Sequence, residues 1–441
     1  MHERQITFGN YGHTLNHRQV ISPDGLWAAY DTRNEDAHIA QTDAIEMVHI
    51  ESCDIVRLYQ TPSQSRYGPG VGAVAFHPRE PRVVFIHGLE NNSSANKYSA
   101  ARRFGAIVDL AKPNTLIHAE ARVHSDHPTG RVLGALSGGT HAHSWNEDGW
   151  LSFTYNDAWL ERQSQIDNTV RDVRTVGFMV PDMPISIECQ LGIPLGEEFS
   201  GTYAAFLAPT LNRLTSSHRR DSSNAVDGWG NDEIEYAVEE CWLKKQHSLA
   251  FLGGVRDERG ILVNEIYVCK LPSKLELVAM MSRPNPGSPP EDILEPVGNC
   301  EQRRLTKTTT RRYPGVQGPR NWLVSSPNGE VVYAPMKDDR GVVQLFGIDA
   351  TTGDIKQITD LEFPIEGQIS LDSSGSTCSF VCQQRIGLTT VSTGATRWLN
   401  NASPNRIVGA VHFVSPTRLL FNRRVGTERE GWLQVFVVDM D

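Results

Sequence analysis

Two histidines separated by a single residue are the first feature of this sequence that could do chemistry. They lie in the run Gly-Gly-Thr-His-Ala-His at residues 138–143. Alternate side chains on a β-strand point to the same side, so His141 and His143 could together bind one divalent metal ion, such as Mn²⁺ or Zn²⁺. Two alternatives remain open. The histidines could act as catalytic bases without a metal, or could only form hydrogen bonds around a water-filled channel.

Tight turns reveal further residues at matching positions. Serine, asparagine, proline and glycine mark turns between strands, and they do so here at residues 22–25, 77–80, 146–149, 326–329, 372–375 and 415–418. Counting back six residues from the second residue of the turns at 22–25, 146–149 and 326–329 gives His17, His141 and Asn321. Counting back four residues gives His143, His412 and, if Trp242 corresponds to Trp145, Glu240.

Arginines near these positions add the capacity to bind an anion. Arg320 directly precedes Asn321, and Arg131 lies in the loop that leads to His141. A guanidinium group can bind a carboxylate through two parallel hydrogen bonds. Glu240 and Asn321 could accept or donate hydrogen bonds to a polar ligand. The sequence therefore predicts a ligand site lined by imidazoles, with an arginine at its edge.

The turns belong to a repeat that must position these side chains. Apolar strands follow the turns at residues 26–30, 83–86, 151–155 and 331–333, and third and fourth strands follow in turn, as at 342–349 and 356–359. Four-stranded repeats of this kind are typical of a β-propeller, in which the innermost strands line a central channel. We therefore expect an all-β propeller whose channel mouth collects the residues named above.

The turn spacing predicts seven blades, with eight or six as alternatives. The gap of 180 residues between Glu147 and Pro327 must hide one or two more units, and residues 200–206 and 241–251 are candidate strands within it. The closing signature of a blade recurs at residues 4–7, whereas the chain ends on a third strand at 432–439. The N-terminal strand is therefore expected to complete the last blade, which removes the open edges of the sheet.

Composition limits the class of protein. The 441 residues carry a net charge of −10, which argues against a nucleic-acid partner held by bulk charge. No apolar run approaches the ~18 residues of a membrane span, and no signal peptide is recognisable, so we expect a cytoplasmic protein. The seven cysteines include no CxxC pair, which favours free thiols. We expect one propeller domain over residues 1–441, with irregular insertions near 208–235 and 272–302.

Several motifs together resemble a known family. They read FIHG at residues 85–88, GGTHAH at 138–143, SFTYND at 152–157, EECW at 239–242, YPG at 313–315 and PRNW at 319–322. The sequence resembles an uncharacterised bacterial family of TolB-like propellers, and more distantly the oligogalacturonate lyases. The resemblance runs from Gln5 to the C-terminus, so it supports the propeller fold over the whole chain.

The lyase resemblance implies a specific chemistry. Oligogalacturonate lyases are seven-bladed propellers that bind Mn²⁺ through histidines and cleave unsaturated digalacturonate by β-elimination. By this resemblance His141 and His143 bind the metal, Arg320 or Arg131 holds the substrate carboxylate, and His17 or His412 removes the proton. Asn321 departs from the pattern of the TolB-like family, which more often has histidine at this position. The lyase metal ligands therefore cannot all be transferred to this sequence.

These observations lead to one function and one alternative. We expect a carbohydrate-active propeller that carries out metal-assisted β-elimination on an oligouronide or a related acidic sugar, with Glu240 and Asn321 as further ligand contacts. The alternative is a non-catalytic, TolB-like propeller that binds a small ligand or a protein partner. We expect a monomer, because a closed ring needs no partner for stability.

Overall fold

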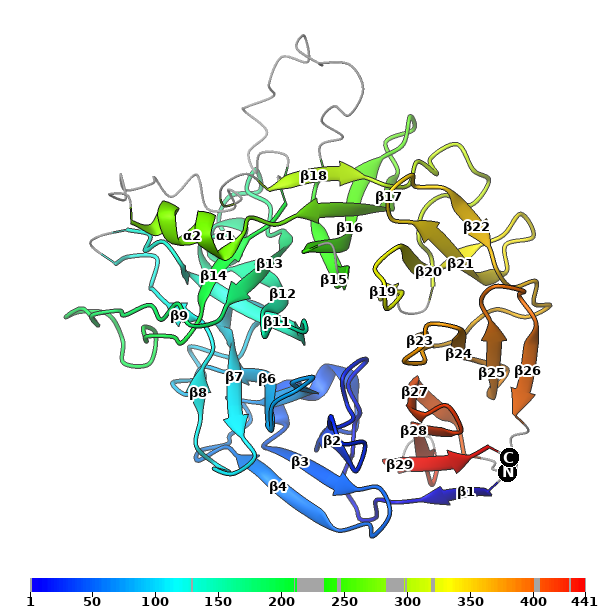
Figure 1. Ribbon diagram of the computed structural model, residues 1–441. Helices are drawn as coiled ribbons and strands as arrows, with labels where there is room; N and C mark the ends of the chain where they lie inside the picture. The colour runs from blue at the N-terminus through cyan, green and yellow to red at the C-terminus, as the bar shows by residue number, and fades with distance from the viewer. Residues whose placement is uncertain are drawn as a thin grey trace.

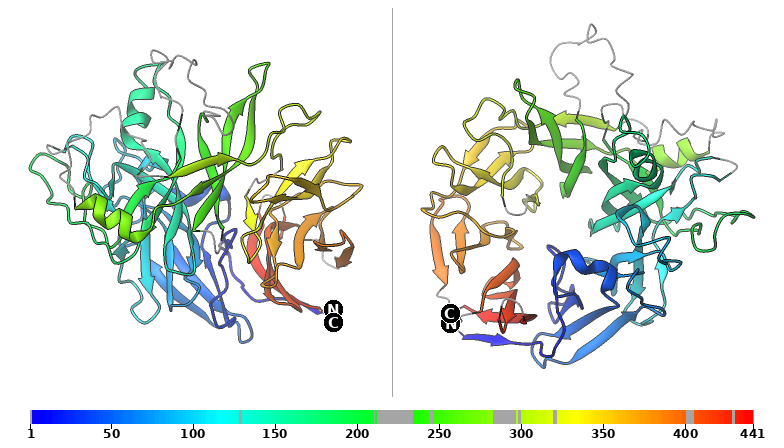
Figure 2. Two further views of the ribbon diagram at one scale, coloured as in Figure 1. Left: turned by 45° about the horizontal axis from the view of Figure 1, so that its top comes forward. Right: turned by 180° about the vertical axis from the view of Figure 1, so that it is seen from behind.

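The computed structural model describes residues 2–127, 130–209, 211, 234–243, 247–282, 297, 300–318, 322–399, 405–427 and 430–440. These residues form a seven-bladed β-propeller, in which small antiparallel sheets are arranged as a ring around a central channel (Figure 1). The same ring is seen from behind and from a tilted direction in Figure 2. The predicted fold class and blade number are confirmed.

The first four blades run from blue to green in Figure 1. Blade 1 contains β2 (Trp27–Asp31), β3 (Ala44–His49) and β4 (Ile55–Gln60), and blade 2 contains β5 (Val71–Phe76), β6 (Arg82–Gly88), β7 (Arg103–Asp109) and β8 (Ile117–His118). Blade 3 contains β11 (Gly138–Trp145), β12 (Leu151–Asp157), β13 (Arg174–Val180) and β14 (Ala204–Leu207). Blade 4 contains β15 (Ala237–Leu243), β16 (Ser248–Arg256), β17 (Leu262–Lys270) and β18 (Glu301–Arg304).

The last three blades complete the ring. Blade 5 contains β19 (Val324–Ser325), β20 (Val331–Lys337), β21 (Val343–Asp349) and β22 (Ile355–Gln357), and blade 6 contains β23 (Ser370–Leu371), β24 (Thr377–Cys382), β25 (Arg385–Thr390) and β26 (Thr396–Leu399). Blade 7 contains β27 (Ile407–Ser415), β28 (Arg418–Val425), β29 (Trp432–Asp439) and β1 (His2–Gln5). Outside the blades lie β9 (Ala121–Arg122), β10 (Ala135–Leu136), α1 (Ala158–Ser164), α2 (Lys274–Met281) and two short 3₁₀ segments, Asp36–Gln41 and Ala100–Arg102.

The N-terminal strand closes the ring, as the sequence predicts. β1 pairs antiparallel with β29, with Arg4 opposite Val437. The side chain of Arg423 on β28 forms two hydrogen bonds of 2.8 Å to the Glu3 carboxylate on β1. The two ends of the chain therefore lie side by side in blade 7 (Figure 1).

The long gap between recognisable turns holds a single additional blade. Residues 241–251, proposed as a hidden unit, belong to the β15–β16 hairpin of blade 4. Residues 200–206 do not begin a blade, because 204–206 fall in β14, the outer strand of blade 3. The apparent similarity of this segment to a second strand was misleading, because a glycine followed by apolar residues also suits an outer strand.

The core lies between neighbouring blades. Alternating apolar residues of adjacent sheets pack against each other, as where Ala29 and Ile45 of blade 1 meet Val74 and Phe85 of blade 2. All seven cysteines are free thiols, and Cys378 and Cys382 are buried in β24, as expected. No helix in the described ranges is long and apolar enough to cross a membrane.

The two predicted insertions are only partly covered. Most of 208–235 lies outside the described residues, as do residues 283–296 of the second insertion. The described beginning of the second insertion is α2, where Ser273 caps the helix and Glu276 completes a capping box. The single-domain assignment stays a prediction.

Candidate functional site

The innermost strands of four blades share an unusual feature that shapes the channel. Each carries a β-bulge, in which extra residues are inserted opposite the second strand, one in β5, β11 and β15 and two in β27. At each bulge one residue has a left-handed backbone conformation: Ala73 (φ 56°), Ala142 (φ 60°), Glu239 (φ 59°) and Gly409 (φ 81°). All four residues line one cavity of about 510 Å³, called the upper cavity here. The repeated bulge therefore turns backbone and side chains of different blades toward one space.

His141 lies at the centre of the chemistry that this cavity offers. Its side chain lines the upper cavity, and its buried Nδ1 has no hydrogen-bond partner among the described residues. Burial, together with the charges of Arg103 and Arg174, holds the pKa of His141 well below its usual range. The imidazole is therefore neutral at physiological pH, the form that can accept a proton.

Two arginines of the cavity stand outside the ion pairs of the described residues, although the charge of Arg174 acts on the Glu239 carboxyl. In contrast, Arg33 is paired with Asp31 at 2.9 Å, and Arg424 is paired with Glu35 at 2.7 Å. Within the described ranges, Arg103 and Arg174 form no ion pair, although both line the upper cavity. The Arg103 guanidinium lies 4.9 Å from the Tyr98 ring centroid, and its buried Nε has no hydrogen-bond partner in this part of the chain. These two groups are therefore suited to bind an anion beside His141.

Two consecutive glutamates mark the bulge of β15. Burial raises the pKa of Glu239 to about 7, with a further contribution from the charge of Glu240. Burial also raises the pKa of Glu240 to about 7, against the opposing effect of Arg18. Only Glu239 lines the upper cavity, whereas Glu240 is fully buried and accepts a hydrogen bond of 2.9 Å from Thr154. Glu239 can therefore act as a proton donor near neutral pH.

The structure separates His143 from His141. The register of β11 against β12 shifts between His141 and Ser144, so the alternation on which the shared-ion prediction depends is broken at Ala142. His143 instead lies on the side of Thr140, with its Nε2 2.9 Å from the Thr140 hydroxyl. It is fully buried and does not line the upper cavity.

The described residues do not supply a metal-ligand set around this pair. Among them, no three His, Cys, Asp or Glu side chains are grouped closely enough to hold a metal ion. The broken alternation is the physical reason: His141 is directed to the cavity and His143 to the interior of the blades. The prediction that both bind one Mn²⁺ or Zn²⁺ ion finds no support in this arrangement.

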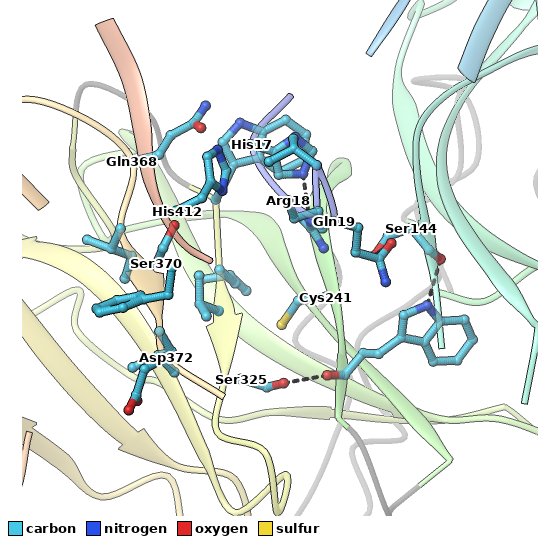
Figure 3. Close-up of a pocket in the computed structure, with 18 of the residues that line it drawn as sticks. His17, Arg18, Gln19, Ser144, Cys241, Ser325, Gln368, Ser370, Asp372 and His412 are labelled. Atoms are coloured by element: carbon cyan, nitrogen blue, oxygen red, sulfur yellow. Dashed lines mark hydrogen bonds between the residues drawn. The ribbon is translucent and has the colours of Figure 1, made fainter. Parts of the chain in front are cut away.

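His17 occupies the middle of the channel. Its ring stacks on Trp322, with centroids 3.8 Å apart, and Arg18 donates a hydrogen bond from Nε to its Nε2. His17, Trp322 and Gln368 line both the upper cavity and a second cavity of about 330 Å³, called the lower cavity here (Figure 3). The stacked pair therefore separates the two spaces.

His412 lies in the lower cavity, away from His141. Gly409 occupies in β27 the bulge position that Ala142 occupies in β11, so His412 corresponds to Trp145 and not to His143. A second register shift between Phe413 and Ser415 lengthens this strand before its turn, which is why counting from the turn misplaced it. The expected single ring containing His17, His141, His143 and His412 is thus wrong. Glu240, by the same register, does correspond to His143.

The remaining predicted residues lie elsewhere. Arg131 does not line either cavity; its charge acts on Tyr155 and Asp157. Arg320 and Asn321 lie outside the described residues. The role of Arg131 as an anion clamp for the channel therefore has no support from its position.

Sequence reasoning missed the two arginines that flank His141. Arg174 ends a charged run at residues 171–174, which favours an exposed ion-pair ladder, and Arg171 does pair with Glu235 at 2.6 Å. Arg103 follows a short 3₁₀ segment with no motif around it. The bulge positions also carry little signal, because two of them are alanine. Only Gly409 has the residue type that a left-handed conformation favours.

The fold and the channel define a seven-bladed β-propeller with a charged cavity at one end of its axis. Residues 70–191 match a family described as a protein of unknown function, DUF3748. The chain is 31% identical over 405 residues to a protein of Escherichia coli strain K12 named uncharacterized protein YidR, covering 91% of this chain and 90% of that one. The chain therefore belongs to the same family as YidR.

Solved structures confirm the fold resemblance expected from the sequence. An oligogalacturonate lyase in complex with manganese matches with a TM-score of 0.53 at 10% identity, covering 100% of this chain and 93% of that one. An oligogalacturonate lyase from Vibrio parahaemolyticus matches with a TM-score of 0.51 at 10% identity, covering 99% and 93%. At this level of identity the similarity shows the shared propeller fold alone.

Proposed function

We propose that the upper cavity binds the carboxylate of an acidic saccharide and promotes a β-elimination reaction on it. The observation that carries the proposal is the position of Arg103 and Arg174. Both flank a neutral His141, and neither forms an ion pair within the described ranges. A volume of about 510 Å³ is within the range of small-molecule sites. The fold shared with oligogalacturonate lyases is consistent with this substrate class.

The proposed step uses three kinds of side chain. Arg103 and Arg174 neutralise the substrate carboxylate, and they stabilise the negative charge that develops when the carbon beside it loses a proton. His141 accepts that proton from C5 of the uronate ring. The electron pair forms the C4–C5 double bond while the C4–O bond breaks, and the leaving oxygen takes a proton from Glu239. The pKa of Glu239, raised to about 7 by burial, suits this donor role.

A metal ion is not needed to balance this step. One of the similar lyase structures is a complex with manganese, but the role of that ion is not transferred to this chain. His141 and His143 point to different sides of β11, and the described residues add no third ligand. No part of the proposed reaction is therefore assigned to a metal.

Activity on oligogalacturonides tests the proposal. Elimination creates a conjugated double bond, so turnover appears as a rise in ultraviolet absorbance. We expect His141→Gln to reduce kcat by at least ~100-fold, the range of a lost general base. Arg103→Gln should raise KM as well as lower kcat, because it binds the carboxylate in both the ground state and the transition state. Arg171→Gln is the control, because Arg171 pairs with Glu235 and does not line the cavity.

The non-catalytic alternative predicts a different result. Oligogalacturonides would then bind the wild-type protein but would not be converted. Arg103→Gln would weaken that binding, and neither protein would show turnover. Absence of both turnover and binding would reject an acidic-saccharide site altogether, and would leave a protein partner as the remaining alternative.

A further inference from the structure

The lower cavity has the properties of a separate ligand site. Its lining includes Pro327 and Asp372, which belong to turns between first and second strands. The upper cavity is lined instead by Gly367 and Arg406, which precede first strands. The two cavities therefore lie toward opposite ends of the channel, with the stacked His17 and Trp322 rings between them.

One end of the lower cavity holds a buried hydrogen-bond donor that the fold leaves unused. Arg18 donates from Nε to His17 and from Nη1 to the Glu240 carbonyl at 2.8 Å, but its buried Nη2 has no partner among the described residues. The buried Nε2 of His412 also lacks a partner in this part of the chain, but burial lowers the pKa of His412 to about 4 and its ring forms a backbone hydrogen bond with Asn16, so the neutral ring has no proton on Nε2 to donate. Figure 3 shows His17, Arg18 and His412 gathered at one end of the cavity. A buried polar group without a partner costs about 1–3 kcal/mol, so Nη2 of Arg18 favours a ligand that accepts a hydrogen bond.

Several other polar groups of this cavity are occupied by the fold itself. Ser325 donates to the Trp242 carbonyl at 2.6 Å, and Gln19 donates to the Trp145 carbonyl at 2.8 Å. Asp372, at the opposite end in Figure 3, accepts a hydrogen bond of 2.9 Å from the Thr377 amide. The guanidinium of Arg18 is therefore the charged group of this cavity that keeps a donor for a ligand.

Arg18 supplies the positive charge at this end. Within the described residues it forms no ion pair; it donates a hydrogen bond to the Glu240 backbone carbonyl, and its charge opposes the rise in the pKa of the buried Glu239 and Glu240 carboxyls. The Glu240 side chain instead accepts a hydrogen bond from Thr154. A buried guanidinium with a free donor binds an oxyanion such as a carboxylate more strongly than a neutral group.

Apolar side chains form part of the cavity wall. The apolar walls are formed by side chains from blades 1, 5, 6 and 7: Ile21, Leu323, Val324, Ile369, Leu371 and Phe413. The volume of about 330 Å³ lies at the small end of the range for ligand sites. We propose that the lower cavity binds a small carboxylic acid, whose carboxylate contacts Arg18 and whose single apolar ring lies against these walls.

Binding of simple carboxylates tests this site directly. Benzoate and cyclohexanecarboxylate are the probes, and benzamide is the neutral probe of matched shape, measured by ligand-observed NMR titration. We expect Arg18→Gln to weaken binding of both carboxylates by at least about tenfold, as the loss of a hydrogen bond to a charged group implies. Benzamide binding should change little. Leu371→Trp, which fills the apolar end without touching Arg18, should also abolish carboxylate binding.

Arg103→Gln separates this site from the upper cavity. It should leave the Arg18-dependent binding of benzoate unchanged, because Arg103 lines only the upper cavity. Loss of benzoate binding in Arg103→Gln but not in Arg18→Gln would overturn the proposal, as would equal affinity for benzoate and benzamide or no binding of either carboxylate. Because these probes and variants do not involve oligogalacturonide turnover, failure here is distinguishable from failure of the proposed activity.

Discussion

Glu120 is fully buried beside His143, and its surroundings determine when its carboxyl group ionises. It accepts hydrogen bonds from the Gly105 amide at 3.0 Å and from the Thr140 hydroxyl. Burial outweighs these bonds and raises its pKa from 4.5 to about 7. The folded protein therefore holds this proton more tightly than the unfolded chain. The resulting stabilisation is complete below about pH 4.5 and is lost as the pH rises through 7.

We expect Glu120→Gln to remove this pH dependence, because the amide oxygen accepts the same hydrogen bonds but does not titrate. Relative to the variant, the wild-type protein should lose roughly 3 kcal/mol of its free energy of unfolding as the pH rises from 4.5 to 7. Urea denaturation at intervals across this range measures the difference. Glu147→Gln, at an exposed carboxylate, is the control. A constant difference between wild type and Glu120→Gln would show that Glu120 is ionised throughout.

At the level of single residues, the turns allowed part of the channel to be predicted. His17 and His141 do line the channel cavities, because the distance from an innermost strand to its turn is similar in several blades. The separation of His143 and His412 could not be predicted. It depends on backbone register shifts in β11 and β27, which an alanine or an ordinary apolar residue does not signal.

Among the secondary-structure elements, the bulged inner strands carry conformational strain that can be measured. Ala142 adopts a left-handed conformation that costs an alanine about 1 kcal/mol relative to glycine. Ala142→Gly should therefore be stabilising by up to about 1 kcal/mol. Gly409→Ala should be destabilising by a similar amount, because an added Cβ there meets no atom within 4 Å and only the backbone cost remains.

Guanidinium denaturation of both variants tests the pair. Ala334→Gly is the control, because Ala334 lies in the ordinary strand β20, where glycine should lower stability by roughly 0.5–1 kcal/mol. If Ala142→Gly lowered stability as much as Ala334→Gly does, the bulge would not be strained in solution.

The elements themselves were partly predictable for a related reason. Hairpin turns carry their own residue preferences, so the strands on either side of them were found. Outer strands such as β14 lack such a turn and are recognised only through their neighbours, because they pair on one edge alone. Residues 200–206 were therefore placed in the wrong strand position, although their apolar character was correctly recognised.

The ring as a whole depends on one short strand from the other end of the chain. β1 supplies the outer edge of blade 7, and the next residues continue the contact, with the Ile6 amide donating to the Val435 carbonyl at 2.9 Å. The closure of the ring could be predicted from the sequence, because residues 4–7 have the pattern of a fourth strand although no other strands of a blade precede them. The division of the channel by His17 and Trp322 could not, since it requires two side chains from different blades to meet.

Deletion of residues 2–7 should therefore affect the whole molecule. It exposes the edge of β29, which becomes free to pair with another chain, and it leaves the buried Arg423 without the Glu3 carboxylate. Removing one partner of a buried ion pair costs about 3–5 kcal/mol, so we expect a large fall in Tm together with association of the protein. Size-exclusion chromatography with light scattering and thermal unfolding measure both effects. Arg4→Ala, which removes only contacts with residues 50, 51 and 53, is the control and should remain unassociated. A truncated protein with unchanged Tm and unchanged mass would mean that the ring is stable without its closing strand.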